Sequence, residues 1–267
     1  MEFIKYTSQF EKMIDNKIIG NLSLVNSEIN FFGKNNILYC DNNIELNDSI
    51  LNFYGDNSIV YLSSNISNLF NLSVFNNSSV FIGKNSKFDV NFSLLIYENQ
   101  NLIIGDDCIV GKNVTISTSD GFPIYYSDSK KRINFSKSVY IGDHVLVGHN
   151  CFISKGVRIG SGTIIDNASF LQSYAKIPSN TYLSGNPAKI IHKKVFFVDD
   201  FVGSFKWDES ANSEFYKSNV FIFDVIGKET LSLTNIDNIL NDLDVESRLE
   251  FIQKLLVQNK RKNRFSI

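Results

Sequence analysis

The chain has 267 residues, with 26 Lys and Arg against 28 Asp and Glu and a formal net charge of −2. A charge this close to zero gives no electrostatic reason for nucleic acid or an anionic membrane to be the main partner. The length exceeds that of most single domains, but a solenoid can extend one continuous core over this many residues.

Residues 1–29 form an N-terminal segment ahead of the repeats. Its first 17 residues, MEFIKYTSQFEKMIDNK, carry charges throughout and contain no apolar run long enough for a signal peptide or a membrane span. We therefore expect a cytoplasmic protein without a membrane span, whose thiols stay reduced.

A repeat begins at about residue 30 and is irregular at first. Phe32 and Tyr54 lie 22 residues apart, and a Gly follows each of them. Ile82 and Ile104 are also 22 residues apart, which corresponds to an 18-residue coil with four extra residues at a corner. This half is rich in Asn, which tolerates the left-handed backbone of a tight corner and can form side-chain ladders between coils.

The segment DGFPIYYSDSKKRINFSKS, residues 120–138, interrupts the repeat shortly before it resumes. A long excursion from one corner of a regular coil is where a rigid scaffold usually builds a functional site. We therefore treat this excursion loop as the first candidate for function.

The repeat is regular from Ile141 to Ala188. This stretch divides into eight hexapeptides that each open with Ile, Val or Leu: IGDHVL, VGHNCF, ISKGVR, IGSGTI, IDNASF, LQSYAK, IPSNTY and LSGNPA. A six-residue period is typical of a parallel β-helix, in which three hexads close one triangular coil. The pattern predicts an all-β fold, with the β-helix over residues 30–192.

The three cysteines, Cys40, Cys108 and Cys151, are widely spaced. Cys108 and Cys151 occupy the fifth place of a hexad, where a small apolar side chain packs inward, so we expect buried thiols. Together with the three histidines they show no ligand spacing, and we expect no metal site.

The C-terminal extension, residues 193–267, leaves the repeat and is expected to be partly helical. Its sequence TNIDNILNDLDVESRLEFIQKLL predicts two helices, the second capped by Asp244. Leu249, Ile252 and Leu256 share one face of that helix, which we expect to pack on the coil or on a neighbouring subunit. The basic run that follows, from Lys260 to Arg264, is interpreted as a solvated helix end, with a polyanion contact as the alternative.

The regular repeat and the segments on either side of it resemble a known family. IGDHVLVGHNCFISKGVRIGSGTIIDNASF followed by IPSNTYLSGNPAKII, with STSDGFPIYYSDSKKRIN upstream, is similar to the bacterial sugar O-acetyltransferases of the left-handed β-helix, hexapeptide-repeat superfamily. The resemblance covers roughly residues 80–198. It is strongest with relatives that acetylate capsule, lipooligosaccharide or sialic-acid glycans.

This resemblance implies a left-handed β-helix that forms a homotrimer, with acetyl-CoA in the groove between adjacent β-helices and the acceptor hydroxyl beside it. Such chemistry needs a base for the hydroxyl proton and a hydrogen-bond donor to the developing oxyanion. In the family the base is generally a His at the place held here by Phe122, and a Trp often stands where this chain has Leu146. Two signature positions are therefore altered.

Three histidines remain as candidates for catalysis. His149 faces outward near the expected thioester end of CoA, and a neutral imidazole there would be a suitable base, oriented by Asp120 or Asp143. The alternative for His149 is a hydrogen-bonded surface residue. His144 is interpreted as a turn or surface residue before a catalytic one, and His192 as solvated or near the CoA phosphates.

The resemblance also implies cofactor contacts. Leu146 and His149 lie at the thioester end, Asn167 and Gln172 fall on successive coils along the groove, and Lys189 stands where relatives place a cation near the nucleotide phosphates. Because exposed Lys side chains are common on any protein surface, a solvated Lys189 is the alternative to a phosphate contact.

For the acceptor, the candidates lie in the excursion loop. Phe122 occupies the position of the usual base, and Tyr125 suits either sugar stacking or trimer packing. Lys131 and Arg132 are suited to an acidic glycan, with a solvated loop tip as the alternative.

We therefore expect an acetyl-CoA-dependent O-acetyltransferase that acts on a cell-surface glycan or its nucleotide-sugar precursor. Two alternatives stay open. One is a catalytically silent hexapeptide-repeat protein that binds a glycan or a partner enzyme, and the other is an N-acyltransferase that acts on an amino sugar.

Overall fold

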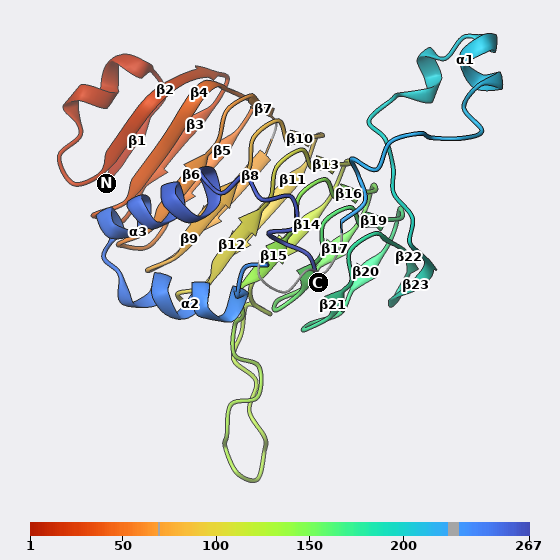
Figure 1. Cartoon of the computed structure of the whole chain (residues 1–267). Helices are drawn as coiled ribbons and strands as arrows, with labels where there is room; N and C mark the ends of the chain where they lie inside the picture. Colours follow the sequence, from red (N-terminus) through yellow and green to blue (C-terminus); the bar gives the residue numbers. More distant parts are fainter. Residues whose placement is uncertain (69, 224–229) are drawn as a thin grey trace.

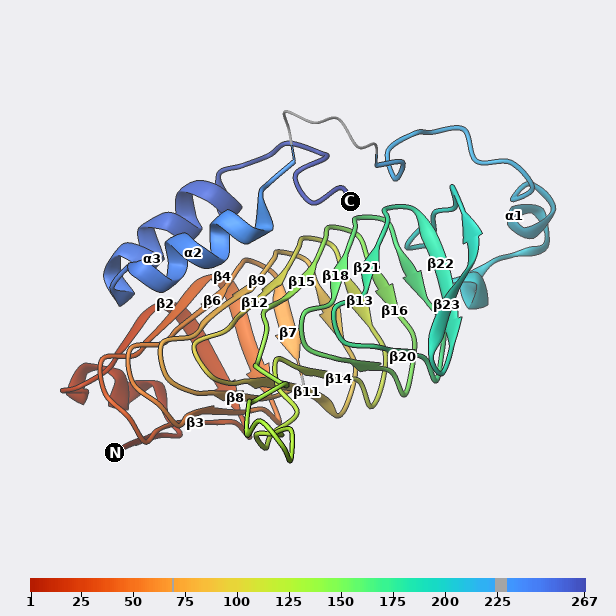
Figure 2. The ribbon, with the colours of Figure 1, turned by 90° about the horizontal axis from the view of Figure 1, so that it is seen from below.

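The computed structural model, which describes residues 1–68, 70–223 and 230–267, is a left-handed parallel β-helix. Short strands stack coil on coil into three sheets, which form the faces of a triangular prism (Figures 1 and 2). Along the chain, each coil passes from face 1 to face 2 and then to face 3. The predicted fold class is confirmed.

The strands of each face are as follows. Face 1 contains β1 (Glu2–Ile4), β3 (Glu28–Phe31), β5 (Ile50–Phe53), β8 (Phe70–Val74), β11 (Phe92–Ile96), β14 (Thr115–Ser117), β17 (Phe152–Ile153) and β20 (Phe170–Leu171). Face 2 contains β2 (Lys17–Val25), β4 (Ile37–Asn47), β6 (Ile59–Leu62), β9 (Ser79–Ile82), β12 (Asn101–Ile104), β15 (Val139–Ile141), β18 (Arg158–Ile159) and β21 (Lys176–Ile177), with β7 (Ile66–Asn68) paired to β4. Face 3 contains β10 (Lys87–Phe88), β13 (Ile109–Val110), β16 (Leu146–Val147), β19 (Ile164–Ile165), β22 (Thr181–Gly185) and β23 (Ala188–Lys193).

The hexapeptide pattern corresponds directly to the core. Equivalent residues of successive regular coils pair in register, for example Ile141 with Ile159 and Ile159 with Ile177. The first residue of every hexad points inward and is at least 94% buried: Ile141, Val147, Ile153, Ile159, Ile165, Leu171, Ile177 and Leu183. Each coil therefore buries its apolar residues against the coils above and below it.

The first and last strands differ from the rest of the prism. β1 runs antiparallel to β3, and β23 runs antiparallel to β22. Parallel pairing between coils begins with Lys17 of β2, which is upstream of residue 30, where the sequence repeat becomes recognisable. The sequence does not reveal these early coils, because their spacing is irregular and because β2 and β4 each run through a corner as one continuous strand.

Asparagine shapes the corners, as the sequence predicts. At the corner between faces 1 and 2, Asn35 and Asn57 have positive φ angles, and Asn35 Nδ2 donates to Asn57 Oδ1 at 2.7 Å. At the corner between faces 3 and 1, Asn91 donates to Asn113, and Asn113 to Asn150, each at 2.9 Å. These ladders hold successive corners in register because each amide both donates and accepts.

The cysteines are buried free thiols, which confirms the expectation. Burial raises the pKa of Cys40 to about 12, and it also raises the pKa values of Cys108 and Cys151. These side chains therefore act as small apolar core residues and stay protonated near neutral pH.

In its described residues, 193–223 and 230–267, the C-terminal extension contains the 3-10 helix η2 (Val202–Ser204), the α-helices α1 (Trp207–Ala211), α2 (Leu233–Asp242) and α3 (Val245–Ile252), and the π-helical turn η3 (Gln253–Val257). Asp244 caps α3 by accepting from the Ser247 amide at 2.8 Å, as predicted. None of the helices in the described ranges is long and apolar enough to cross a membrane.

Helices α2 and α3 lie on face 2 (Figure 2). Ile252 and Leu256, which the sequence places on one helical face, join Leu240 in an apolar cluster with face 2 side chains such as Tyr61 and Tyr140. The helix pair therefore packs on the coil of its own chain and removes much of face 2 from solvent.

A buried polar contact fixes this packing. The Asp237 carboxylate of α2 accepts hydrogen bonds from Asn101 Nδ2 at 3.0 Å, Ser138 Oγ at 2.6 Å and the Tyr140 hydroxyl. A buried carboxylate without partners would be costly, so these donors specify one position for α2 on the face.

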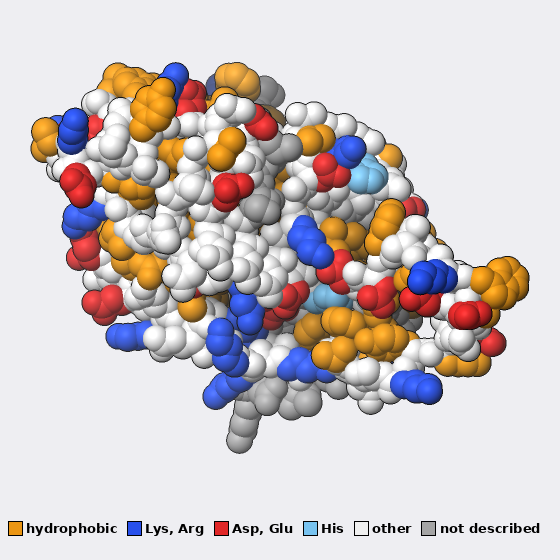
Figure 3. All heavy atoms as spheres, turned by 90° about the horizontal axis from the view of Figure 1, so that it is seen from above, with side chains coloured by type: hydrophobic (Ala, Val, Ile, Leu, Met, Phe, Trp, Pro, Cys, Tyr) orange, Lys and Arg blue, Asp and Glu red, His pale blue; other side chains and the backbone are white. Residues whose placement is uncertain are grey.

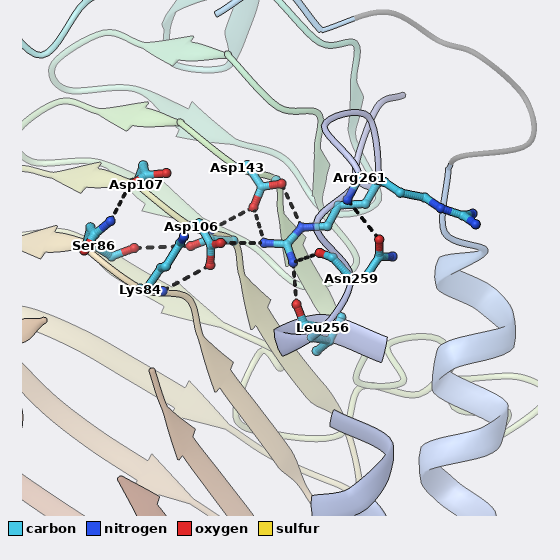
Figure 4. A network of polar contacts seen from close by, with 12 residues as sticks. Lys84, Ser86, Asp106, Asp107, Asp143, Leu256, Asn259 and Arg261 are labelled. Carbon is cyan, nitrogen blue, oxygen red and sulfur yellow. Dashed lines mark hydrogen bonds and ion pairs between the residues drawn. The ribbon is translucent and has the colours of Figure 1, made fainter. Parts of the chain in front are cut away.

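Arg264 anchors the end of the chain to the corner between faces 2 and 3. Its guanidinium binds both oxygens of Asp143, at 2.9 and 2.7 Å, and lies 3.1 Å from Asp106 Oδ2. It also donates to the Asn259 carbonyl at 2.9 Å and to the Leu256 carbonyl, and Figure 4 shows these partners. The interpretation of the basic run as a solvated helix end is therefore wrong for Arg264, whose side chain is only 3% exposed.

We predict that Arg264→Ala lowers the free energy of unfolding by about 3–5 kcal/mol, because it leaves two largely desolvated carboxylates, Asp106 and Asp143, without their buried cation. Chemical denaturation monitored by circular dichroism measures this loss. Lys260→Ala, in the same basic run but exposed, is the matched control and should change stability by less than about 0.5 kcal/mol. Equal stability of the two variants would contradict the anchoring role of Arg264.

Candidate functional site

A groove with a volume of about 620 Å³ runs along face 3. Its floor is a stripe of partly exposed side chains, one from each coil: Ile109, Leu146, Ile164 and Tyr182. These residues occupy equivalent positions of β13, β16, β19 and β22 and pair in register. In each strand the next residue, Val110, Val147, Ile165 or Leu183, points into the core, so the stripe side chains point out into the groove.

The corner between faces 3 and 1 forms one wall of the groove. The His149 amide donates to Asn167 Oδ1 at 2.7 Å, and the Lys112 amide donates to His149 Nδ1 at 2.8 Å. A Cβ on Gly148 would lie 2.6 Å from Asn167 Oδ1, and a Cβ on Gly111 would lie 2.5 Å from His149 Nδ1. Glycine is thus required at both positions so that these side chains can approach the backbone. The predicted cofactor contacts Leu146, His149 and Asn167 all line this groove.

The hydrogen bond from Lys112 determines the chemistry of His149. Because a backbone N–H donates to Nδ1, the neutral ring carries its proton on Nε2. The exposed Nε2–H is then a hydrogen-bond donor, and the ring has no free lone pair with which to accept a proton. The predicted role of His149 as general base does not fit this arrangement within a single chain.

Neither predicted orienting carboxylate binds His149. Asp143 is engaged by Arg264, whereas Asp120 pairs with Lys155 and accepts from Asn134 Nδ2 at 2.9 Å. The hypothesis that one of them orients the imidazole is therefore wrong for the single chain, since both are already bound elsewhere. The partner of the ring is the Lys112 backbone, which no side-chain motif in the sequence indicates.

His144 is buried, contrary to its interpretation as a surface residue. Its ring lies between Phe197 and Phe221 of the C-terminal extension, with centroid distances of 4.0 and 4.1 Å and nearly parallel planes. Its Nε2 lies 3.0 Å from the Phe197 carbonyl, and burial lowers its pKa. His144 does occupy a turn, with a φ angle of 54°, but it faces away from the groove and contacts the extension.

The excursion loop projects from the corner between faces 1 and 2 as a hairpin (Figure 1). The Tyr126 amide donates to the Lys131 carbonyl and the Ile133 amide to the Ile124 carbonyl, each at 3.0 Å. Phe122 is 82% exposed and Tyr125 is 55% exposed, and Lys131 is exposed at the tip. In the single chain, these predicted acceptor residues are thus available to a partner molecule.

A polar cluster holds the base of the hairpin. Asn134 Nδ2 donates to the Phe122 carbonyl at 2.8 Å as well as to Asp120, and the Ile124 amide donates to Asn134 Oδ1 at 2.7 Å. Burial raises the pKa of Asp120, but its bonds to Lys155 and Asn134 outweigh this effect and lower it. The predicted catalytic Asp120 is therefore an ionised anchor for the loop, and the buried Lys155 is a partner that sequence analysis missed.

Arg132 is also engaged within the chain. Its two terminal nitrogens donate to the two oxygens of Glu98, at 2.7 and 2.8 Å. Hydrogen bonds from Arg132 and Ser136 lower the pKa of Glu98 to about 2. The stabilisation is present above pH 4.5, the ordinary value for Glu98, and is lost as the pH falls towards 2. Arg132 therefore stabilises the hairpin, and Lys131 remains the more accessible cation for an acidic ligand.

Gln172 and Lys189 do not line the groove. Asn167 lies at the corner between faces 3 and 1, whereas Gln172 follows β20 and lies at the corner between faces 1 and 2. The prediction that these two residues follow one groove on successive coils is wrong within a single chain. Lys189 lies on β23 opposite Ser184 and is exposed, and His192 of the same strand stacks on Tyr182 at the end of the groove.

Several residues of the groove were not predicted from the sequence. Asp166 accepts from Ser184 Oγ at 3.0 Å and from the Asn167 amide at 2.9 Å, and these bonds lower its pKa. Lys87 pairs in register with Ile109 at the β10 end of the groove and forms an ion pair with Asp199 of the extension at 2.5 Å. The position of Tyr182 follows from the 18-residue period, but the Lys87 contact depends on the extension and has no signal in the sequence.

The comparisons with known proteins agree with this architecture. Residues 101–124 and 138–172 match a family described as the hexapeptide repeat of succinyl-transferase. A crystal structure of the polySia specific acetyltransferase NeuO is 30% identical, covers 74% of this chain and 96% of its own, and has a TM-score of 0.64. The polysialic acid O-acetyltransferase OatWY is 24% identical, covers 75% of this chain and 99% of its own, and has a TM-score of 0.57. A comparison with curated protein sequences found no match.

Proposed function

Because the chain belongs to the bacterial hexapeptide-repeat sugar O-acetyltransferases, we propose that it transfers the acetyl group of acetyl-CoA to a hydroxyl of a cell-surface glycan or its nucleotide-sugar precursor. We further propose that it works as a homotrimer in the cytoplasm. The observation that carries the proposal is the groove of face 3, which combines an apolar floor with polar groups at its corner. The similarity of the chain to a polysialic acid acetyltransferase supports it further.

In this reaction the acceptor oxygen attacks the thioester carbonyl carbon, and a C–O bond forms while the carbonyl oxygen becomes an oxyanion. The carbon–sulfur bond then breaks, so that the products are an acetyl ester and CoA thiol, which takes up the proton lost by the hydroxyl. The apolar stripe of Ile109, Leu146 and Ile164 is suited to the acyl and pantetheine part of the donor.

We assign His149 as the hydrogen-bond donor of the site. Its Nε2–H is exposed on the groove wall, and the Lys112 and Asn167 contacts hold the ring and its backbone in place. A fixed donor of this kind stabilises negative charge as it develops on the thioester oxygen. This role replaces the general-base role that the sequence suggested.

A second candidate function is a catalytically silent glycan-binding or scaffold protein. The specific observation in its favour is that Phe122, in the place of the family's base, offers no proton acceptor. N-acyl transfer to an amino sugar is a further alternative, because a free amine attacks without needing a base to deprotonate it first. Trimer formation does not distinguish these functions, since all of them are compatible with it.

The first experiment is a calorimetric titration with acetyl-CoA, followed by a thiol-release assay with sialylated and neutral glycans. We expect saturable binding and release of CoA thiol that depends on the acceptor. If acetyl-CoA binds but no glycan in the panel causes release of CoA thiol, the result would favour the silent protein. The same holds if acetyl-CoA does not bind at millimolar concentration. Release that depends only on amino sugars would favour N-acyl transfer.

Phe122→His tests whether the missing base limits turnover. The polar cluster around Asn134 holds the Phe122 backbone, so an imidazole introduced there would stand where the family places its base. We expect the kcat for O-acetyl transfer to rise by about 10²–10⁴-fold, the usual contribution of a general base. Phe122→Leu controls for loss of the aromatic ring. An unchanged kcat for Phe122→His would argue against an otherwise intact O-acetyltransferase site.

The donor role of His149 has a separate test. We expect His149→Ala to lower kcat by about 10²–10³-fold, with little change in the affinity for acetyl-CoA. His149→Gln keeps an N–H donor near the same place and should retain much more activity than the Ala variant. If His149 is instead the base, Gln and Ala will be equally inactive, because an amide cannot accept the proton.

A further inference from the structure

Residues 198–220 form an arm that leaves the prism beside β23 and returns to it (Figure 1). The arm contains η2 and α1, and its large apolar side chains face solvent. Trp207 is 85% exposed, Phe201 79%, Phe215 77% and Val202 73%, and Figure 3 shows hydrophobic side chains on the surface of the arm between charged ones. Exposure of several large apolar groups on one projection is typical of a surface that a partner covers.

Both legs of the arm are clamped to the corner between faces 2 and 3. Phe197 on the outgoing leg and Phe221 on the returning leg stack on opposite sides of His144. Asn180 Nδ2 donates to the Val195 carbonyl at 3.0 Å and to the Phe221 carbonyl at 2.8 Å. The base of the arm is thus fixed to the solenoid, although its tip has no such support.

The excursion loop, residues 120–138, has the complementary character. Its exposed side chains include Phe122, Ile124, Tyr125 and Tyr126, all at least 50% exposed. The loop carries two acidic and four basic residues, whereas the arm carries five acidic and two basic residues. One projection is therefore apolar and basic, and the other is apolar and acidic.

The two projections cannot meet within one chain. The excursion leaves the corner between faces 1 and 2 and the arm leaves the corner between faces 2 and 3, with the helices α2 and α3 covering face 2 between them. Figure 1 shows them pointing in different directions. One clamp of the arm, His144, lies at the height of the excursion, because the excursion ends at β15 and His144 is three residues beyond that strand, whereas the other clamp, Asn180, follows β21 two coils further along.

We propose that the arm of one subunit docks on the excursion loop of a second copy of this chain. A contact between two different surfaces, repeated around a three-fold axis, closes a ring, so the inference rests on the proposed homotrimer. The ion pair between Asp199 of the arm and Lys87 holds the outgoing leg at the β10 end of the face 3 groove.

Sedimentation equilibrium of the full chain tests the apolar part of this contact. We expect the combined variant Trp207→Ala/Phe215→Ala to raise the concentration for half-maximal trimer assembly by about 10- to 100-fold. Ile14→Ala removes a side chain that is 91% exposed far from either projection and should leave assembly unchanged. Equal assembly of the arm variant and wild type, or a wild type that is monomeric at all concentrations, would overturn the inference.

Charge reversal tests the identity of the partner surface. Asp208→Lys/Glu214→Lys on the arm and Lys130→Glu/Lys131→Glu on the excursion should each weaken assembly, whereas the chain with all four changes should recover most of it. Failure of the combined variant to recover more than either parent would contradict docking of arm on excursion. The thiol-release assay tests the proposed function independently of this contact. A trimer that assembles through the arm and the excursion but transfers no acetyl group would contradict the proposed function and still support the docking.

Discussion

The structure depends on the corners of the coil, where one residue must adopt a left-handed backbone so that the chain can turn onto the next face. At the corner between faces 2 and 3, this position is held by Asn65, Asn85, Asp107 and then His144. Asn and Asp tolerate that backbone and form ladders, whereas His144 uses the same position to hold both legs of the arm. The requirement for a turn thus places functional side chains at regular heights on the prism edges.

The same periodicity explains what the sequence could predict. An inward residue at the start of each hexad, buried thiols at the fifth place and an Asp cap on α3 are local patterns, and the structure confirms each of them. The same period shows why the predicted position of Gln172 is wrong. His149 and Asn167 are 18 residues apart and stand on successive coils, but Gln172 is only five residues beyond Asn167 and so belongs to the next corner.

Contacts between the solenoid and the irregular segments could not be predicted. Arg264 reaches Asp143 across 121 residues, and Arg132 reaches Glu98 across 34 residues. Neither spacing is related to the coil period, because Arg264 and Arg132 lie in segments outside the repeat, the tail and the excursion loop. The tautomer of His149 likewise depends on a backbone amide of the preceding coil, which has no side-chain signature.

The reversal of direction at both ends of the prism affects how the protein behaves in concentrated solution. A stack of parallel strands leaves an open row of amides and carbonyls at each end, where a further chain can add as it does in a growing fibre. β1 instead lies antiparallel across the first end of face 1 and β23 across the last end of face 3, and β23 adds Lys189 and Lys193 along its exposed length. On these two faces a further parallel coil meets a strand of the opposite direction, so the reversed strands disfavour end-to-end stacking of this repetitive, Asn-rich solenoid.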